Sequence, residues 1–449
     1  MISLLKFWVA FSLFLIGGQL VAPTLVFAEE QTSPSVEDFS NQLSLSVDSA
    51  LAIDNESGQI LYQKDDNQLH GIASLTKLLS LFVVYDAIHD GKLSMDTKVP
   101  VSKEVEELAT LPGYANVPLK ESKDFYTVSD LIDATIIGSA NAAIVALAEE
   151  IGGSEQGFVS LMKDKLTELG ISDYEIYTAS GMKAQYLVTD NGDASSLDKE
   201  NKMRARDILF LARELVKTYP EIQDRAQVSR KEFPVSKDET YELVNHNKFL
   251  PGLPHERSDI YGLKTGTEEE AGSCIIVITE IAGREVYAIT MGADSDEARY
   301  GETNRLLDYL QNQLEWVTLQ SKGEAITDGQ TADISKGQSE TTSLVYGEDV
   351  GLFVPHNYDL SNHIETSYSS AWQYNAKGRI VLNAPLDKDK AVNTVVTRVP
   401  FYDTLFNEPT LENTIYPTED VLAINRFVHI SRIMADMFEE WSNRLFASE

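Results

Sequence analysis

The fold is decided by residues 274–291, CIIVITEIAGREVYAITM. Its two halves are rich in β-branched apolar residues and flank Ala282-Gly283-Arg284, a pattern that predicts a β-hairpin. Far upstream, residues 49–63 repeat the pattern around Asn55-Glu56-Ser57-Gly58 and predict a second hairpin. Two hairpins so far apart in the chain must be joined by something other than a simple meander of strands.

Helical spacing of apolar residues fills the interval between the hairpins. The predicted helices cover residues 75–88, 128–137, 141–151, 157–169 and 205–219, and one more helix is predicted over 297–317. Strands at both ends with helices between them are incompatible with regular βαβ winding. We therefore predict an α+β domain over residues 46–317, in which distant segments close an antiparallel sheet with flanking helices and a helical insertion.

The composition changes after residue 317. Residues 319–341 are rich in Gly, Ser, Thr, Gln and Asp, which is typical of a linker or loop. Short strand-like runs then follow at 343–346, 350–354, 379–382 and 393–399. These runs predict a small all-β domain over 318–412. The last segment, 418–447, is predicted to be an amphipathic helix.

Charge and composition exclude several classes of protein. The 449 residues carry 37 Lys and Arg against 70 Asp and Glu, a net charge of −33, which argues against a nucleic-acid partner. Hydrophobic residues make up 43% of the chain, which is enough for a sizeable core. A single cysteine, Cys274, excludes an internal disulfide and is expected to be a small buried strand residue. The seven histidines show no metal-binding spacing, and we expect neither a metal nor a cofactor.

The N-terminus has the order of an export signal. Lys6 is followed by an apolar stretch, and Val26-Phe27-Ala28 closes it before two glutamates, so residues 1–28 predict a cleavable signal peptide. An uncleaved anchor is the alternative. Residues 29–45 are polar and are predicted to form a loose leader. A chain exported in this way works outside the cytoplasm.

The first candidate catalytic element is Ser74-Leu75-Thr76-Lys77, at the start of a strongly apolar helical run. Residues three positions apart share a helix face, so the Lys77 amine can reach the Ser74 hydroxyl. A serine hydroxyl becomes a strong nucleophile when a neighbouring base takes its proton, and a buried lysine can be that base. Four other SxxK matches in the chain lack the apolar run, and an ordinary surface pair is the alternative for any single match.

The second element is Ser139-Ala140-Asn141, predicted to lie on a loop between two helices. A loop serine can relay a proton to a leaving group, and a side-chain amide can hold a peptide. Simple capping of the following helix is the alternative.

The third element is Lys264-Thr265-Gly266-Thr267, which precedes the decisive hairpin and is predicted to lie at a sheet edge. A cation there can anchor a carboxylate, Gly266 allows close approach of another backbone, and an extended strand can donate to an oxyanion. A turn with a solvated lysine is the alternative.

The order SxxK, SxN, KTG resembles the serine penicillin-interacting enzymes. Residues 71–78, 245–250, 262–267 and 271–274 resemble the low-molecular-mass penicillin-binding proteins, which are D-alanyl-D-alanine carboxypeptidases. The resemblance covers roughly residues 45–315 and implies a β-lactamase/transpeptidase-like fold. The chain departs from the family pattern at two places. Many relatives have a basic residue and a proline before the Ala-Ser, where this chain has His70-Gly71-Ile72, and many have aspartate after the SxN element, where this chain has Ala142.

The resemblance implies a role for each motif residue. Ser74 would attack the penultimate D-alanine carbonyl of a peptidoglycan stem pentapeptide, Lys77 would accept its proton, and Ser139 would protonate the departing D-alanine. The substrate-binding residues would be Asn141, Lys264, Thr265, Gly266 and Thr267. The same acyl-enzyme chemistry implies covalent inhibition by β-lactams, no metal and no cofactor.

Three other functions are weighed. A class A β-lactamase needs a deacylating glutamate, and the best look-alike, Glu242, lies too close to Lys264 in sequence. A non-enzymatic wall-binding protein would be expected to lack Ser74, Lys77 or Lys264, and none of these is missing. A D,D-transpeptidase would use the same acyl-enzyme with an amine acceptor, which the sequence does not separate from hydrolysis. His70 lies near the nucleophile but has no carboxylate partner in the spacing of a catalytic triad.

The tail separates into two faces when residues 421–446 are placed on a helix. The apolar face predicts either insertion into a membrane interface or packing on a protein surface. Charged residues interrupt the segment, so it does not predict a span. The resemblance favours the membrane, and it places the enzyme on the outer face of the bacterial cytoplasmic membrane, at the cell wall.

Overall fold

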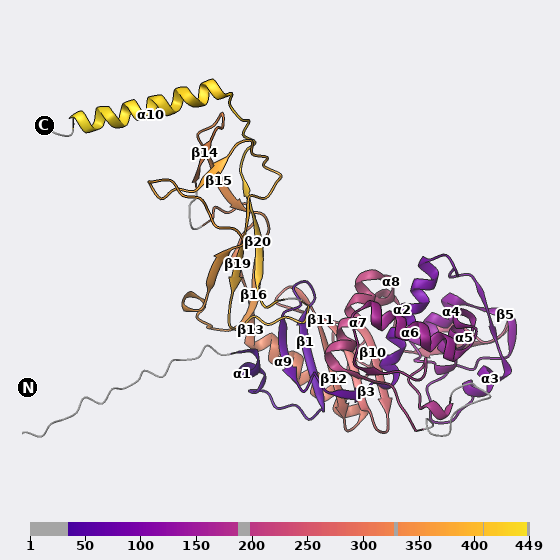
Figure 1. Ribbon diagram of the computed structural model, residues 1–449. Helices are drawn as coiled ribbons and strands as arrows, with labels where there is room; N and C mark the ends of the chain where they lie inside the picture. Colours follow the sequence, from indigo (N-terminus) through magenta and orange to yellow (C-terminus); the bar gives the residue numbers. More distant parts are fainter. Residues whose placement is uncertain (1–34, 187–197, 327–330, 407, 447–449) are drawn as a thin grey trace, which may run out of the picture. The chain divides into compact units, whose positions relative to one another are not determined.

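The computed structural model describes residues 35–186, 198–326, 331–406 and 408–446 (Figure 1). The predicted signal peptide, residues 1–28, lies outside the described residues. Within the predicted leader, α1 (Val36–Ser40) begins with a capping box at Ser35 and buries Val36 and Phe39 in the main core. The prediction of a loose leader was therefore wrong for these residues, because Phe39 packs against the rings of Tyr309 and Phe401.

The central sheet confirms the predicted closure by distant hairpins. Its strand order is β10-β11-β12-β1-β2, and β1 pairs antiparallel with β12, with Leu51 opposite Ile289. The strands are β1 (Ser49–Asp54), β2 (Ile60–Lys64), β10 (Ile260–Glu268), β11 (Gly272–Ile281) and β12 (Arg284–Ala293). β11 is buried at nearly every position, as expected of a strand covered on both faces. Cys274 is a fully buried strand residue, as predicted.

Helices cover the sheet and form the predicted insertion. The helices of this region are α2 (Thr76–His89), α3 (Lys103–Ala109), α4 (Val128–Ile136), α5 (Asn141–Gly152), α6 (Glu155–Glu168), α7 (Ala205–Thr218), α8 (Glu221–Ala226) and α9 (Asp296–Gln313). α7 packs on β1 and β12, and α9 packs on β11 and β12. α2 is buried along almost its whole length against α5, α6 and α7, which explains why its sequence is apolar on all sides.

Short strands complete this region in three small sheets. They pair β3 (Leu69–Gly71) with β7 (Lys202–Arg204) and β7 with β6 (Tyr174–Glu175), β4 (Lys98–Val101) with β5 (Ser122–Thr127), and β8 (Arg230–Pro234) with β9 (Thr240–Val244). Among the described residues of this region, η1 (Ala73–Leu75) and η2 (Ala184–Tyr186) are single turns of 3-10 helix. η1 directly precedes α2 and contacts β10.

The predicted helix over 297–317 was wrong at its end. α9 stops at Gln313, and Leu314 is already extended. Residues 314–317 instead begin β13 (Leu314–Gln320), which pairs with β16 (Val350–Pro355). Pairing with a strand distant in sequence outweighed the local helical spacing, and it buries Phe353 against Trp316.

The C-terminal β region, residues 314–425, contains the predicted strands and some that were missed. A sheet of order β17-β19-β20-β15-β14-β18 joins β14 (Thr331–Ser335), β15 (Thr341–Tyr346), β17 (Glu365–Tyr368), β18 (Val381–Asn383), β19 (Asn393–Arg398) and β20 (Leu411–Pro417). β14 lies within the segment predicted to be a linker, so that prediction was wrong for 331–335. A single turn, η4 (Leu360–Asn362), precedes β17. The sheet has a small core of its own around Ile326, Leu344 and Ile415.

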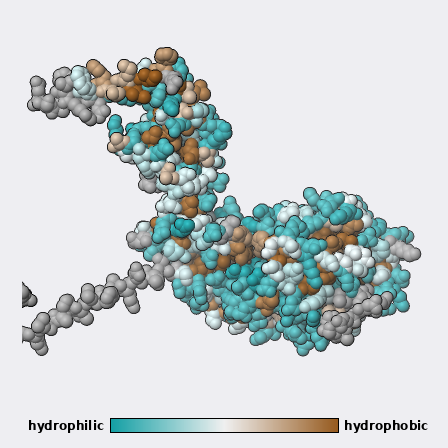
Figure 2. All heavy atoms as spheres, viewed as in Figure 1, coloured by the Kyte–Doolittle hydropathy of each residue, from teal (hydrophilic) through white to brown (hydrophobic). Residues whose placement is uncertain are grey.

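The C-terminal helix, α10 (Arg426–Phe446), begins later than predicted. Residues 418–425 are not helical, and Val421 among them is buried and bridges to Leu386. Figure 2 shows apolar residues gathered over this helix. Its large side chains are exposed, with Phe427 at 85%, Phe438 at 67% and Trp441 at 60%. Within the described part of the chain, no helix has the length and hydropathy needed to cross a membrane.

Candidate active site

The SxxK element lies where the chain turns into α2. Ser74 is the central residue of η1, and Lys77 lies in the first turn of α2. Ala73, just before the serine, has a φ of 44°, a left-handed conformation that is rare for a residue with a side chain. The result is a half-buried hydroxyl presented at a helix start, next to a fully buried amine.

The Lys77 amine is held by three oxygens. Its Nζ lies 2.8 Å from Ser74 Oγ, 2.7 Å from Asn141 Oδ1 and 2.6 Å from the carbonyl oxygen of Ser180. The contact with Asn141 joins the first and second sequence elements. These contacts fix the position of an amine that burial would otherwise leave without partners.

The SxN element lies on the loop between α4 and α5, as predicted. Ser139 has a φ of 53°, and Asn141 is the first residue of α5. The capping alternative is wrong: the N-cap residue is Ala140, without a side-chain cap, and the Asn141 carboxamide accepts from Lys77 instead.

The KTG element lies on β10, the edge strand of the central sheet, as predicted. Lys264 is only 2% exposed, so the alternative of a solvated lysine is wrong. Its Nζ donates to Ser139 Oγ at 2.8 Å, which joins the second and third elements. A Cβ on Gly266 would lie 2.9 Å from the carbonyl oxygen of Ile72, so only glycine lets β10 approach the residues before Ser74 this closely.

One cavity of about 600 Å³ brings the three elements together. Its lining includes Ser74, Ser139, Asn141, Thr265 and Thr267. The two lysine amines lie buried behind this lining, each 2.8 Å from one serine hydroxyl. All eight sequence-predicted site residues are thus in or directly beside one cavity.

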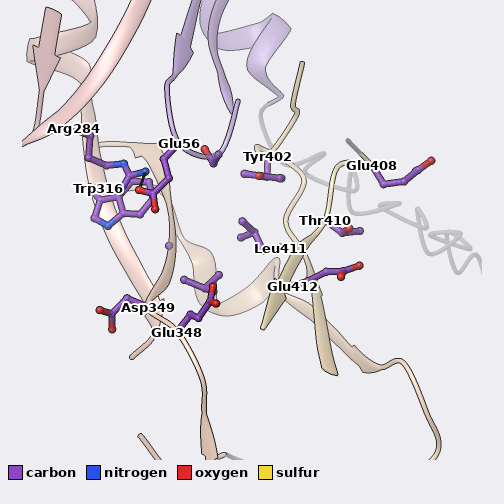
Figure 3. Close-up of a pocket in the computed structure, with 13 residues that line it drawn as sticks. Glu56, Arg284, Trp316, Glu348, Asp349, Tyr402, Glu408, Thr410, Leu411 and Glu412 are labelled. Atoms are coloured by element: carbon purple, nitrogen blue, oxygen red, sulfur yellow. Dashed lines mark hydrogen bonds and ion pairs between the residues drawn. The ribbon is translucent and has the colours of Figure 1, made fainter. Parts of the chain in front are cut away.

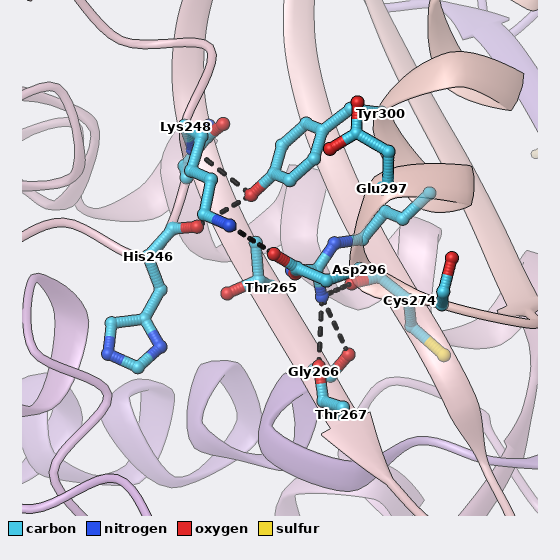
Figure 4. Close-up of polar contacts among 12 residues, drawn as sticks. His246, Lys248, Thr265, Gly266, Thr267, Cys274, Asp296, Glu297 and Tyr300 are labelled. Atoms are coloured by element: carbon cyan, nitrogen blue, oxygen red, sulfur yellow. Dashed lines mark hydrogen bonds and ion pairs between the residues drawn. The ribbon is translucent and has the colours of Figure 1, made fainter. Parts of the chain in front are cut away.

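Arg299, on α9, is a residue that the sequence analysis missed. It is 3% exposed, and its Nη1 donates to the carbonyl oxygens of Gly266 and Cys274 and to Thr267 Oγ1, at 3.1, 3.2 and 3.0 Å. Figure 4 labels these three acceptor residues and Asp296. Asp296, one turn before Arg299, forms an ion pair with it. Arg299 therefore holds the KTG strand from behind. No short motif marks it, since it lies 32 residues after Thr267.

The electrostatics of the cavity favour a neutral amine at Lys77. Burial lowers the pKa of Lys77 well below its usual value, and the Lys264 charge lowers it further. Burial and the charge of Arg299 lower the pKa of Lys264 to about 7. A neutral lysine has a lone pair that can accept a hydroxyl proton, so the site contains a serine with a base in place.

His246 also lines the cavity and lies within 245–250, one of the stretches that carry the family resemblance. Burial lowers its pKa to about 4, and the charges of Lys264, Arg299 and Lys77 add to that effect. The imidazole is neutral at physiological pH, so it can donate or accept a hydrogen bond but adds no charge.

A larger cavity, of about 710 Å³, lies elsewhere beside the turn after β1 (Figure 3). Arg284 stacks on Trp316, with its guanidinium carbon 3.7 Å from the ring centroid, and pairs with Glu56. Ser57 lines this cavity, but no lysine or histidine is among the described residues of its lining. The smaller cavity, where two buried lysine amines each lie 2.8 Å from a serine hydroxyl, is therefore the candidate active site.

Two other residues from the sequence analysis lie away from the site. Glu242, the β-lactamase look-alike, lies on β9 and forms an exposed ion pair with Arg230. His70 lies on β3 opposite Met203 and does not line the cavity. Among the described residues, no group of three or more His, Cys, Asp and Glu side chains is placed to hold a metal ion.

Solved structures with the same fold define the class of this protein. A peptidoglycan synthesis regulatory factor, PBP3, from Streptococcus pneumoniae matches 84% of this chain and all of its own, with a TM-score of 0.68 and 29% identity. Penicillin-binding protein 5 from Haemophilus influenzae matches 85% of this chain and 98% of its own at a TM-score of 0.62; at 21% identity it bears on the fold alone. The fold is that of the serine penicillin-binding enzymes.

The sequence comparisons are more specific. The family model described as D-alanyl-D-alanine carboxypeptidase, peptidase family S11, matches residues 35–295. The chain is 25% identical to DacF, a D-alanyl-D-alanine carboxypeptidase of Bacillus subtilis, over 92% of this chain and 95% of DacF. It is 28% identical to DacC of Escherichia coli over 88% and 87% of the two chains. The chain belongs to the S11 family of serine-type D-alanyl-D-alanine carboxypeptidases.

Proposed function

We propose that Ser74 is the nucleophile and Lys77 the base of this carboxypeptidase. The observation that carries the proposal is the 2.8 Å distance between Ser74 Oγ and a buried lysine amine whose pKa is lowered. Lys77 takes the hydroxyl proton as Ser74 attacks the carbonyl between the last two D-alanines of a stem peptide. The attack forms a tetrahedral oxyanion, which we assign to the backbone N–H groups of Ser74 and Thr267.

Collapse of the oxyanion breaks the C–N bond and expels the terminal D-alanine. Ser139 relays to the departing amine the proton that Lys77 took from Ser74, which leaves Lys77 neutral again. Lys264, 2.8 Å from Ser139 Oγ, is the cation beside that relay. The products of this half-reaction are free D-alanine and an ester on Ser74. Water then attacks the ester, with Lys77 again accepting the proton, and releases a stem peptide one residue shorter.

Substrate binding rests on the other motif residues. The terminal carboxylate of the peptide would lie at Thr265 and Thr267, near the charges of Lys264 and Arg299. Asn141 would hold the peptide backbone through its carboxamide, and Gly266 keeps the strand free of a side chain at the point of closest approach. A β-lactam presents the same carboxylate and carbonyl, so it would acylate Ser74. No step requires a metal or a cofactor.

The test is intact-protein mass spectrometry after incubation with benzylpenicillin, together with an assay of D-alanine release from a pentapeptide. We expect one penicilloyl adduct on the full chain and none on Ser74→Ala. Ser160→Ala, in an SxxK match on the exposed side of α6, is the matched control and should keep the adduct. An adduct that persists on Ser74→Ala would refute the assignment.

A D,D-transpeptidase or β-lactamase activity would use the same acyl-enzyme. The β-lactamase alternative is disfavoured because Glu242 pairs with Arg230 on an exposed hairpin. Release of D-alanine without added amine acceptor separates hydrolysis from transpeptidation.

We propose in addition that the enzyme is exported and acts at the outer face of the cytoplasmic membrane, on the cell wall. Residues 1–28 have the order of a signal peptide. The exposed apolar side chains of α10 support insertion of this helix into the membrane interface. Because acids outnumber arginines in the tail, attachment would depend on apolar area rather than on attraction to anionic lipid.

A further inference from the structure

The strand that carries the KTG element ends at Glu268, and Glu269 and Glu270 follow in the turn. Glu268 and Glu269 line the same cavity as Ser74, together with Tyr114. We call Tyr114, Glu268 and Glu269 the amine subsite. These residues play no part in the catalytic steps proposed above, so their presence in the cavity needs another explanation.

The two carboxylates are available to a ligand. Glu268 is half-buried and Glu269 exposed, and within the described residues no hydrogen bond or ion pair engages either carboxylate. Glu270 differs, because it pairs with Lys183 at 3.1 Å. Burial raises the pKa of Glu268, the nearby cation Lys183 lowers it, and the charges of Glu200, Glu269 and Glu270 raise it further. The acids therefore outnumber the cation at this end of the cavity.

Tyr114 supplies an aromatic surface beside these acids. Its ring lies edge-on to Tyr186, with the centroids 5.0 Å apart. Burial raises the pKa of the Tyr114 phenol, the hydrogen bond with Tyr186 adds to this, and the charges of Glu268 and Glu269 raise it further, so both carboxylates lie near the ring. An aromatic face next to carboxylates suits an alkyl ammonium group, whose methylenes pack on the ring while the charge meets the acids.

The direction in which an extended peptide pairs with β10 places its upstream residues at the amine subsite. β10 is an edge strand, so an extended peptide can pair with its free edge. An antiparallel peptide with its carboxylate at Thr265 and Thr267 has its upstream residues beyond Thr267, because β10 runs from Ile260 to Glu268. The residue before the two D-alanines therefore lies beside Glu268 and Glu269.

We propose that Glu268, Glu269 and Tyr114 select stem peptides whose residue before D-Ala-D-Ala carries a free side-chain amine, as L-lysine does. This inference rests on the proposed function and names its substrate class. The cavity then has a cationic end for the terminal carboxylate and an anionic end for the upstream amine. A side chain that ends in a neutral amide or in a carboxylate would lose this attraction or be repelled.

The experiment compares two tripeptides that differ only in one charge. Nα-acetyl-L-Lys-D-Ala-D-Ala has a free ε-amine, and Nα,Nε-diacetyl-L-Lys-D-Ala-D-Ala does not. The full chain should release D-alanine from the first with a kcat/KM about three- to tenfold higher, as expected of partly exposed ion pairs. In the double variant Glu268→Gln/Glu269→Gln the ratio should fall to about one. Glu280→Gln, an exposed glutamate on β11, is the charge-matched control and should keep the wild-type ratio.

A second measurement needs no variant. Raising NaCl from 50 to 500 mM should shrink the wild-type ratio towards one, because salt screens partly exposed charges. A wild-type ratio of one or below, a ratio that survives in the double variant, or a salt-independent ratio would each overturn the proposal. Failure of the proposed function gives a different result: D-alanine release from both peptides would persist in Ser74→Ala.

Discussion

Lys264 and Ser139 form a buried lysine–serine pair, with Nζ and Oγ 2.8 Å apart, that repeats the pairing of Lys77 with Ser74 in the same cavity. Burial lowers the pKa of Lys77, and the Lys264 charge lowers it further. The site can thus hold one neutral amine and one cation, which are the two states that a base and an anchor require.

Removal of the amine at position 77 tests its role as a base. Lys77→Met keeps most of the length of the side chain but replaces the basic amine with a thioether, which is far too weak a base to accept the Ser74 proton. We expect the rate of acylation by benzylpenicillin to fall by a factor of about 10² to 10⁴. The rate is measured by mass spectrometry of reactions quenched at timed intervals. The control is Lys163→Met, the lysine of an SxxK match on α6, which should acylate at the wild-type rate. Acylation of Lys77→Met within threefold of wild type would refute the role.

The pH dependence of kcat/KM should be bell-shaped. Activity rises with pH as Lys77 loses its proton and becomes a base, at a pH well below the usual value for lysine. Activity falls again near pH 7, because Lys264, with a pKa of about 7 in the free enzyme, then loses the charge that anchors the substrate carboxylate. In kcat the falling limb should lie at higher pH, since the bound carboxylate stabilises the cation. Identical falling limbs in kcat and kcat/KM would contradict this.

Arg299 is a positioning residue whose charge also acts on Lys264. In Arg299→Gln the loss of that charge should raise the pKa of Lys264, so the falling limb of kcat/KM moves to higher pH. KM should rise, because Thr267 loses its donor at 3.0 Å. Arg305→Gln, an exposed arginine later on α9, is the control and should leave the profile unchanged. A purely structural role for Arg299 predicts less folded enzyme with an unshifted profile.

Gly181 should not tolerate a side chain. Its φ is +84°, and a Cβ would lie 1.9 Å from the carbonyl oxygen of Ala73, directly before the nucleophile. Gly181→Ala should therefore cost well over the roughly 1 kcal/mol expected for a left-handed glycine alone. Gly153 has a φ of +70° and open space around it, so Gly153→Ala should lower the free energy of unfolding only by that backbone contribution. Urea unfolding of both variants measures the difference; equal midpoints would show that the clash relaxes without cost.

Deletion of residues 426–449 should release the enzyme from membranes and leave acylation intact. The cut retains the buried Val421 and removes the polar contacts of Arg432 with the carbonyl oxygens of Gly337 and Gln338 and with Glu340. Co-sedimentation with phospholipid vesicles is the measurement. Replacing Phe427, Phe438 and Trp441 by serine tests the apolar face itself, and binding by either variant at the wild-type level would contradict the anchor.

The sequence predicted most of the fold and the gathering of the motifs, because both are written in local patterns. Alternating apolar runs with turn residues marked both hairpins, and helical spacing marked α2 and α4 to α7. The errors arose where distant pairing decides the structure. Residues 314–317 satisfy a helical pattern, yet β16 draws them into a strand. Phe39 lies in a polar segment but is buried by aromatic rings far along the chain.

The same distinction holds for the site. Motif spacing pointed to Ser74, Lys77, Ser139 and Lys264, because a fixed chemistry requires fixed residue types. Arg299 was missed, since an arginine on a long polar helix resembles any exposed helix residue until α9 is packed on the sheet. The carbonyl oxygen of Ser180, which accepts from Lys77, belongs to the backbone and has no signature in residue type.

The pairing of β1 with β12 sets an order of events in folding. Ser49 meets Met291, so the middle of the sheet joins two segments separated by most of the helical insertion. A nascent or translocating chain exposes the first hairpin long before its partner is available, and such non-local topology folds slowly. Ser74, the proposed nucleophile, lies between these segments in the sequence, and we expect its site to be complete only after β12 has paired with β1.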